Sequence, residues 1–418
     1  MSGGGKFYGS PRWSGEIADC SLPVSFDTYS NCSFGCAYCF SQFQRSNGKC
    51  GESYLRKIVK PVNVERVKKI FTGEIESQFW PYIKDKRPIQ WGGLSDQFDN
   101  YERKYGKTLE LMEFFSDLNY PISFSTKSTW VFHDERYMRL FRKQGPNWNV
   151  KFSIITLNEH NAAVIEQGVD SPQKRLEAMR ILSDAGCSAT LRMRPFIIGV
   201  TSRDYLELIR AGKEHGASAL SAEFMCVETR AMTHEGTKSN FDRISRIAGF
   251  DILKFYKENS SGAGYLRLNR EIKAPYVQKM KALCDDIGLR LYISDAHFKE
   301  CCNNSCCCGL NSEWKYSRGN FSYALQVARE KGEVRFSDIE GDMYFLNFKW
   351  ASAENYNTSS VEKRARFRNY TMKDYLRFLW DTPKNPNSPM NAFGGILKPS
   401  GVDANGDVVY KFNPRVTV

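Results

Sequence analysis

The sequence predicts an α/β protein built as a full or partial TIM-like (β/α) barrel with a C-terminal α+β extension. Short apolar segments alternate with amphipathic helical segments at intervals of about 30–40 residues, which is typical of repeated βαβ units with a parallel sheet. Six or more such units are enough to close a barrel. The chain has 418 residues, which leaves room for a catalytic domain of about 250–300 residues and an appendage.

The individual elements follow from hydrophobic periodicity and from helix end signals. For example, Ser171 is suited to cap a helix, Pro172 to occupy its first turn and Gly186 to follow its end. The predicted helices are Val64–Ile83, Thr108–Leu118 (capped by Thr108), His133–Lys143, Ser171–Ala185, Ser202–His215 and Tyr276–Ile287. The predicted strands are Val24–Tyr29, Pro88–Trp91, Pro121–Ser125, Val150–Leu157, Ala189–Ile198, Ala219–Met225 and Arg290–Ser294, with an irregular stretch at Glu228–Gly262.

These elements suggest a lead-in over residues 1–22, a barrel over 23–298 and a cysteine-rich segment with the extension over 299–418. In the extension, Ser322–Lys331 and Met372–Trp380 have helical patterns. The segment Val402–Val408 has the composition of a tight hairpin turn.

Composition narrows the class of protein. With 41% hydrophobic and 14% aromatic residues the chain is globular, and no apolar run reaches the roughly 18 residues of a membrane span. The polar, glycine-rich N-terminus is unlike a signal peptide. Eight of the 13 cysteines fall in two tight groups, which favours metal ligation over disulfides and therefore a reducing, cytoplasmic location.

The formal net charge is +12 and the pI is near 9.0. Basic residues concentrate in Arg56–Lys69, Arg136–Lys151 and Glu362–Arg377. Such a balance favours a polyanionic partner such as nucleic acid. The alternative is a solvated basic surface without a dedicated partner.

The first cysteine group, Cys32, Cys36 and Cys39, has the spacing C-x3-C-x2-C and follows the apolar run Leu22–Phe26. Three thiolates this close in sequence can hold three irons of a cubane cluster and leave the fourth open to a ligand. The alternatives are a zinc loop or three unrelated buried thiols. Zinc would need a fourth ligand nearby, and Cys50 is separated from the motif by a polar loop.

Glycine or polar residues close the predicted strands at the end where a barrel carries its chemistry. Glycine allows a ligand to approach the backbone, lysine can pair with a carboxylate, and arginine can grip one with two hydrogen bonds. Two arginines that lie two residues apart share one face of a strand. As a set around one pocket, the candidate cofactor contacts are Gly92, Gly93, Ser125, Lys127, Ser153 and Arg192 or Arg194.

The second cysteine group lies in the sequence HFKECCNNSCCCGL after the last predicted strand. Packing alone does not explain this density of thiols, so we predict a second metal site, either an auxiliary iron–sulfur cluster or zinc. Adjacent cysteines seldom all bind one ion, and the most widely spaced set is Cys302, Cys306 and Cys308, with His297 as a further candidate. The predicted metal residues of this group are Cys301, Cys302, Cys306, Cys307 and Cys308.

With the aromatic Tyr38 directly before its last cysteine, the first motif resembles the signature of the radical S-adenosylmethionine (SAM) superfamily. The resemblance implies a [4Fe-4S] cluster whose open iron chelates the amino and carboxylate groups of SAM. It also implies electron transfer to the sulfonium, a 5′-deoxyadenosyl radical that abstracts hydrogen from a substrate, and a reductant such as flavodoxin or ferredoxin. Gly92 and Gly93 would bind the SAM amino group through backbone carbonyls, and Tyr38 would lie at the cofactor.

Three further segments resemble the spore photoproduct lyase and DNA repair photolyase-like branch of that superfamily: TKS after the third strand, RLEAMRILSDAG and RMRPFIIGVTSRD. The likeness covers about Thr28–Glu228. It implies repair of a methylene-bridged thymine dimer and a cysteine that returns hydrogen to the product. Cys187 and Cys226 are the candidates, of which Cys226 lies nearer the catalytic face; a buried structural thiol is the alternative for either.

The sequence thus predicts a radical SAM enzyme acting on a nucleobase in DNA or RNA, for repair or modification. Such an enzyme must extrude the base or act on single strands. The second hypothesis is a peptide- or small-molecule-modifying radical SAM enzyme, because the second cysteine group resembles the auxiliary-cluster regions of peptide maturases. The third is a zinc-stabilised nucleic-acid-binding protein. The oligomeric state is not predicted.

Overall fold

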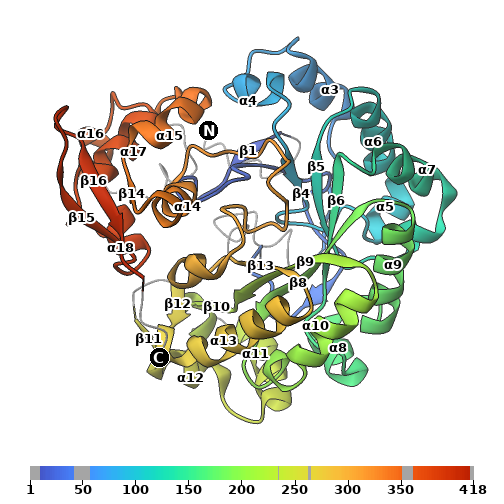
Figure 1. The fold of residues 1–418 in the computed structure, drawn as a ribbon. Coiled ribbons are helices and arrows are strands. Elements are labelled where there is room, and N and C mark those ends of the chain that lie inside the picture. The colour runs from blue at the N-terminus through green and yellow to red at the C-terminus, as the bar shows by residue number, and fades with distance from the viewer. Residues whose placement is uncertain (1–9, 42–56, 234, 262–264, 351–360, 415–418) are drawn as a thin grey trace. The chain divides into compact units, whose positions relative to one another are not determined.

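The computed structural model describes residues 10–41, 57–233, 235–261, 265–350 and 361–414. Cys50 and most of the polar segment around it lie outside these residues. Within them the largest sheet has eight strands, and the parallel strands at its centre confirm the predicted α/β barrel-type fold (Figure 1). In spatial order the eight strands are β1 (Arg12–Trp13), β2 (Val24–Phe26), β4 (Ile89–Trp91), β5 (Ile122–Thr126), β6 (Trp148–Ser153), β8 (Ser188–Phe196), β9 (Ala217–Phe224) and β13 (Arg290–Ile293). The edge strand β1 runs antiparallel to β2.

The chain divides into two compact units. The second consists of Pro11–Ser25, Lys69–Ile89 and the chain from Tyr292 onward, and the rest forms the first. Both units are discontinuous in sequence. The domain boundaries predicted after residues 22 and 298 stay a prediction.

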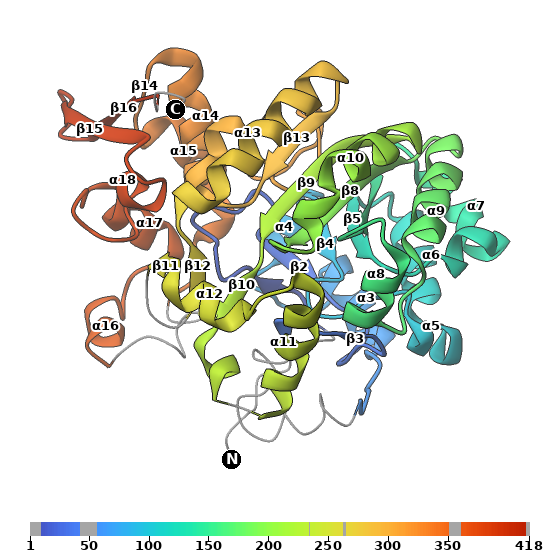
Figure 2. The same ribbon diagram turned by 90° about the horizontal axis from the view of Figure 1, so that it is seen from below.

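In the first unit, one set of alternating strand residues packs against helices. Phe124 and Trp148 both contact Phe141 of α7 (Glu135–Gln144) through their rings. A Cβ on Gly212 of α10 (Tyr205–Glu214) would come within 2.7 Å of Leu191. The apolar positions therefore face the outer helices, which are seen along the sheet in Figures 1 and 2.

The other set of strand residues points away from these helices and is polar. Asn149 donates to Ser123 Oγ at 3.2 Å, and Thr190 donates to Asn149 Oδ1 at 3.1 Å. Because parallel neighbours in register point the same way, β5, β6, β8 and β9 share one inward polar face. Its members are Ser123, Ser125, Asn149, Lys151, Ser153, Thr190, Arg192, Arg194, Ser221 and Glu223.

Most predicted helices of the barrel exist with shifted ends. In α9 (Pro172–Asp184) the Ser171 side chain accepts from the Lys174 amide and Gly186 follows at φ 81°, which confirms the predicted caps. The predicted cap of α6 (Lys107–Asp117) was wrong, because Gly106 takes the N-cap position. The Thr108 hydroxyl instead donates to the Gln97 carbonyl at 2.8 Å.

Two helix predictions were wrong in extent. The single helix expected over Val64–Ile83 is divided into α3 (Val64–Thr72) and α4 (Trp80–Lys84), with Gly73 in the left-handed region directly after α3. The expected irregular stretch contains α11 (Glu235–Ala248) and α12 (Ile252–Glu258). Phe241, Ile244 and Ala248 of α11 are buried, at the spacing of one helix face.

The remaining elements of the first unit are short, apart from α13 (Arg270–Asp286), which begins before its predicted start. They include a three-stranded antiparallel sheet in the order β10 (Cys226–Glu228), β12 (Tyr265–Leu268) and β11 (Ser260–Ser261). The others are β3 (Gly35–Cys36), β7 (Glu166–Gln167), α5 (Asn100–Tyr105) and α8 (Glu159–Ile165).

The second unit contains the predicted hairpin, in which β15 (Leu397–Val402) pairs antiparallel with β16 (Val408–Phe412) and β14 (Glu333–Val334) extends the sheet. Its apolar core includes Trp13, which stacks on Phe345 and Phe348. No helix in the described part of the chain is long and apolar enough to cross a membrane. Besides α4, the α-helices of the second unit are α14 (Phe321–Lys331), α15 (Ser337–Glu340), α16 (Val361–Arg366), α17 (Met372–Trp380) and α18 (Pro389–Ala392).

Candidate active site

The cysteine loop, residues 32–39, follows β2, and its three cysteine residues are partly buried. Inside the loop, β3 pairs antiparallel with β7, so that Gly35 lies opposite Gln167 and Cys36 opposite Glu166. The Ala37 amide also donates to the Ile165 carbonyl at 2.8 Å. The backbone around Cys36 is therefore fixed by main-chain bonds.

Two cationic side chains bind the carbonyls of the same loop. Lys57 Nζ donates to the carbonyls of Cys32 (3.2 Å) and Phe34 (2.7 Å). Arg243 Nη2 donates to the Gly35 carbonyl at 3.2 Å. Positive charge is thus placed beside a loop whose thiolates would carry negative charge when they bind a metal.

Two buried carboxylates connect the cysteine loop to the neighbouring strand ends. Asp99 accepts from the Ser33 amide at 2.5 Å and caps α5. Asp96 accepts from the Lys127 amide (2.6 Å) and from Thr126 Oγ1 (2.9 Å) at the end of β5. Burial raises the pKa of both carboxyl groups, that of Asp99 to about 7.

A buried chain of polar side chains positions Tyr38. The Tyr38 hydroxyl donates to Glu166, and Glu166 forms an ion pair with Arg175 of α9 at 2.8 Å. The side chains of Arg175 and Glu166 are 0% and 1% exposed. Arg175 also donates to the Ser153 carbonyl at 2.5 Å, which links the cysteine loop to the end of β6.

Burial raises the thiol pKa of Cys36 to about 12; Lys127 opposes this shift and Glu166 adds to it. Burial likewise raises the pKa of Cys32, with Asp99 and Asp96 adding to the effect. Metal binding must therefore displace protons from these thiols. Among the described residues, no three Cys, His, Asp or Glu side chains already lie in positions that could hold one metal ion. The cysteine side chains would have to turn toward one another to share a cluster.

Beside this loop, buried polar atoms at the ends of β4 and β5 have no hydrogen-bond partner among the described residues. They are both amide atoms of Gln97 and the hydroxyl of Ser125. Gly92 lies against them at φ 89°, where an added Cβ would come within 2.1 Å of Gln97 Oε1 and 2.8 Å of the Ser125 carbonyl. Unsatisfied buried polar groups next to an obligatory glycine suit a polar ligand. We call Gly92, Gln97 and Ser125 the cradle. Its unsatisfied polar atoms are the reason why SAM fits this site.

The predicted contacts on β6 and β8 also come together. Arg192 Nη1 donates to Ser153 Oγ at 3.1 Å, and Lys127 Nζ lies 5.7 Å from the centre of the Tyr38 ring. Arg194, on the same inward face, lies 3.5 Å from Glu223. Gly93 follows Gly92 in the loop after β4 and is partly exposed.

The two candidate hydrogen donors lie in different surroundings. Cys187 is buried at the start of β8 and donates to the Phe141 carbonyl at 2.9 Å, as a structural thiol does. Cys226 begins β10, lies opposite Arg267 of β12 and is partly buried. Cys226 therefore remains the candidate nearer the ends of the parallel strands.

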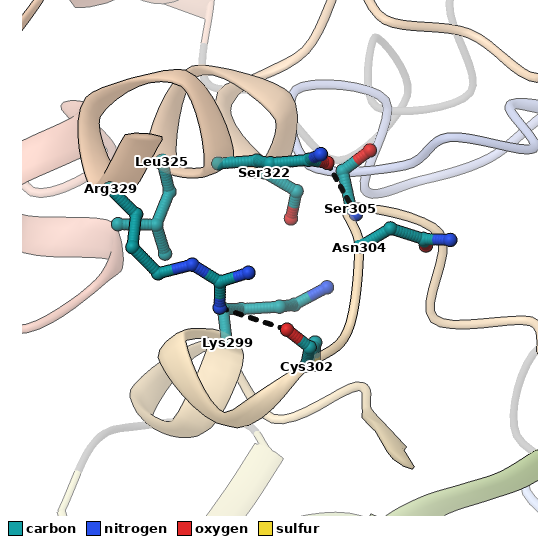
Figure 3. Close-up of a pocket in the computed structure, with 8 residues that line it drawn as sticks. Lys299, Cys302, Asn304, Ser305, Ser322, Leu325 and Arg329 are labelled. Atoms are coloured by element: carbon teal, nitrogen blue, oxygen red, sulfur yellow. Dashed lines mark hydrogen bonds between the residues drawn. The ribbon is translucent and has the colours of Figure 1, made fainter. Parts of the chain in front are cut away.

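The second cysteine group lies in the second unit and is largely buried. Cys302, Cys306 and Cys308 are buried, whereas Cys301 and Cys307 are partly buried. A small pocket beside it has a volume of about 10 Å³, the room of one water molecule. Figure 3 shows Arg329 of this pocket directed at the Cys302 carbonyl, to which it donates at 2.9 Å.

Sequence reasoning missed several residues of the site: Asp96, Gln97, Asp99, Glu166 and Arg175. Polar residues directly after Gly92 and Gly93 were an available signal for the first three, because they follow a barrel strand. Arg175 gave none, since it lies among other charged residues of a helical pattern, and Glu166 lies in a segment for which no element was predicted.

Residues 27–212 match the Radical SAM superfamily model. The chain contains a radical SAM domain. It is accordingly an enzyme of SAM-dependent radical chemistry. The matched segment spans the cysteine loop, the cradle of Gln97 and Ser125, and strands β4 to β8.

Similar solved structures include radical SAM enzymes. Spore photoproduct lyase complexed with dinucleoside spore photoproduct is 18% identical, covering 65% of this chain and 76% of that one at a TM-score of 0.47. Streptococcus suis SuiB bound to S-adenosylmethionine is 12% identical, covering 68% and 54% at a TM-score of 0.40. No curated protein matches the chain.

Proposed function

We propose that this radical SAM enzyme abstracts hydrogen from a nucleobase in DNA or RNA, in a repair or modification reaction. The observation that carries the site assignment is the anchored cysteine loop beside the cradle of Gly92, Gln97 and Ser125. Cys32, Cys36 and Cys39 would hold a [4Fe-4S] cluster, and the cradle would receive SAM. When bound, these groups supply a 5′-deoxyadenosyl radical.

The protein's own residues would position and shield the reacting groups. Asp96 and Asp99 fix the loop of the cradle relative to the cysteine loop. Arg192, held by Ser153, and Lys127 are cations suited to a carboxylate. Gln97 can offer both an amide donor and an acceptor, as a zwitterionic ligand requires.

Charge on the inward face supports an anionic substrate. Arg192 and Arg194 lie on the inward face of β8 and are partly buried, and Lys127 directly follows β5. Glu223, the one carboxylate on these four strands, pairs with Arg194. Cations converging on a cleft raise the local concentration of an anion such as a nucleic-acid phosphate. The formal charge of +12 has the same sign.

The predicted basic segment on α7 gives little support, because its cations are paired with acids. Exposed ion pairs of this kind leave little net charge for a phosphate backbone. The pairs are Arg136–Asp134, Arg139–Glu113, Arg142–Glu135 and Lys143–Asp117. Arg194 is paired as well, with Glu223, so Lys127 and Arg192 are the cations that carry the charge argument for a nucleic acid at the inward face.

A peptide substrate is the second proposal, and the second cysteine group is the observation that favours it. An auxiliary metal centre with an open coordination position would anchor a substrate through a side-chain donor, whereas a closed centre would not.

The deciding experiment uses protein purified and reconstituted with iron and sulfide without oxygen. We expect 5′-deoxyadenosine from SAM when dithionite, or a flavodoxin or ferredoxin system, supplies electrons. Single-stranded DNA, RNA and a mixed peptide library are then added separately in deuterated and ordinary buffer. A nucleobase substrate predicts faster SAM cleavage, or deuterium exchange, with nucleic acid only.

Nucleic-acid binding should also weaken steeply as salt rises, because counterions are released on binding. Arg194→Ala on the inward face should weaken nucleic-acid binding, whereas the control Arg139→Ala on α7 should leave it unchanged. Stimulation by peptide alone would replace the substrate proposal. A reconstituted protein that carries no iron and cleaves no SAM would overturn the cofactor assignment.

A further inference from the structure

Cys20, which belongs to neither predicted cysteine group, lies in the same buried cluster as the second group. The apolar centre of this cluster contains Leu22, Leu310 and Tyr316 together with Cys306 and Cys308. Cys20 and Cys307 pack against it from partly buried positions. Four thiols thus meet in one cluster within the second unit.

Hydrogen bonds explain why the lead-in reaches this segment. Ser21 Oγ donates to the Ser305 carbonyl at 3.0 Å, and the Ser317 amide donates to the Ser21 carbonyl at 2.9 Å. These bonds fix the backbone on the residue next to Cys20 against both ends of the segment 305–317. The placement of Cys20 is therefore specified by the fold.

The three consecutive cysteines lie in a turn rather than a strand. The Gly309 amide donates to the Cys306 carbonyl at 3.4 Å, and Gly309 has φ 87°. The Cys306 amide is held by Asn304 Oδ1 at 2.8 Å. In a strand, consecutive side chains alternate between faces, whereas a turn allows neighbouring thiols to approach one centre.

The other two cysteines of the group lie outside the apolar cluster. Cys302 Sγ accepts from the Ile293 amide at 3.1 Å and donates to the Ile293 carbonyl at 3.4 Å. Cys301 ends the 3₁₀ helix Ala296–Cys301 and is not a member of the apolar cluster. Cys302 still interacts electrostatically with Cys307. It differs from the other four thiols by its hydrogen bonds to Ile293 and, like Cys301, by its place outside the apolar cluster.

We propose that Cys20, Cys306, Cys307 and Cys308 form a tetrathiolate metal centre that joins the N-terminal lead-in to the cysteine-rich segment. Four thiolates satisfy a structural zinc ion or a closed iron–sulfur cluster. Each ligand thiol gives up its proton to solvent when the metal binds. No vacant position is left, so the centre is structural and does not activate SAM.

Electrostatic interactions also connect these thiols. Burial, together with Cys307 and Cys308, raises the pKa of the Cys20 thiol, so these thiols are close enough to interact. Lys299 is buried in the same unit and forms an ion pair with Asp19 at 3.3 Å. Asp19 already balances this cation, so the bound metal itself offsets the negative charge of the thiolates.

As with the cysteine loop, no three of these thiols are already in ligand positions among the described residues. A cysteine side chain changes its direction by rotation about χ1 alone. Metal uptake then requires rotation of thiols that the backbone has already brought together.

The test starts from the triple variant Cys32→Ala, Cys36→Ala, Cys39→Ala, which removes the cysteine loop as a metal site. We expect this protein, purified without oxygen, to retain bound metal. Metal and sulfide analysis then distinguishes zinc from an iron–sulfur cluster. After the metal is stripped, Co²⁺ should produce the charge-transfer absorption of a thiolate–cobalt complex.

Adding Cys20→Val keeps the apolar volume and removes the ligand, so we expect loss of the retained metal and of the cobalt band. Cys301→Ala in the same background is the matched control and should retain both. Circular dichroism checks that each variant is folded. If Cys20→Val unfolds the protein, Cys20→His, which can still ligate zinc or cobalt, should restore folding in the presence of the metal.

Full metal retention in folded Cys20→Val would overturn the proposal, and so would a triple variant that binds neither zinc, iron nor cobalt. Neither result touches the proposed function, because SAM cleavage is measured separately in protein with an intact cysteine loop.

Discussion

The two cysteine groups place the same side chain in opposite environments. In the cysteine loop the cysteine residues are only partly buried, and the backbone is held by β7 and by the cations Lys57 and Arg243. In the second group Cys306 and Cys308 lie among apolar side chains and themselves form part of the core. Neighbouring residues hold the backbone of the first group, whereas the side chains of the second group are themselves part of the core packing.

This difference separates two kinds of metal chemistry. A site that must admit a cofactor needs ligands on an accessible loop and an open coordination position, whereas a structural site is closed and buried. The cradle of Gln97 and Ser125 beside the cysteine loop fits the first kind. The apolar cluster around Cys306 and Cys308 fits the second.

The largest expected effect is on activity. Cys36→Ala should abolish SAM cleavage while leaving the far-UV circular dichroism and thermal midpoint close to those of the unsubstituted protein, because the thiol holds no part of the fold. Cys308→Ala should show the reverse result. SAM cleavage should be retained, and the thermal midpoint should fall because core packing is lost. Global unfolding of Cys36→Ala would contradict the assignment of the loop as an independent cofactor site.

The next effect concerns Glu166 and Arg175, the buried side chains that position Tyr38. Arg175→Met leaves Glu166 buried without its partner, and loss of one member of a buried pair costs about 3–5 kcal/mol. Urea unfolding should show this loss, and iron content after reconstitution should fall. Arg180→Met in the same helix breaks an exposed pair with Glu177 and should change neither. Equal effects of the two substitutions would remove Arg175 from any positioning role.

The sequence predicted those parts of the fold that local patterns control. Ser171, Pro172 and Gly186 mark the ends of α9 by chemistry that acts within a few residues. Thr108 misled for the same reason: it resembles a cap, but tertiary structure gives its hydroxyl to the Gln97 carbonyl. The cysteine spacing was equally local, so the cofactor loop could be predicted.

Long-range partners could not be predicted in this way. Arg175 is a charged residue in a helical pattern, and only the packing of α9 places it beside Glu166. Cys20 stands alone in the sequence, and only the hydrogen bonds of Ser21 bring it to Cys307 and Cys308. The alternation of polar and apolar residues in TLRMR and NVKFS did predict the inward polar face, because a strand has a fixed period of two.

A smaller effect tests the cradle. Gly92→Ala introduces a Cβ against Gln97 Oε1 and the Ser125 carbonyl, at a φ that is strained for alanine, and such strain costs about 1–3 kcal/mol. We expect this loss of stability together with weaker SAM binding, measured by equilibrium dialysis. Gly106→Ala shares the positive φ but would meet nothing within 4 Å, so it isolates strain from contact. Unchanged SAM binding in Gly92→Ala would exclude the cradle as the cofactor site.

The smallest effect divides the second group internally. Cys302→Ala leaves the buried Ile293 amide without its sulfur acceptor, which costs about 1–2 kcal/mol. In the background without the cysteine loop, this variant should unfold at lower urea but retain its metal, because Cys302 is bonded to Ile293 rather than to the four-thiol cluster. Loss of metal from folded Cys302→Ala would instead make Cys302 a ligand. The distance of each thiol from the metal, and not its hydrogen bonds in the metal-free protein, would then decide which thiols are ligands.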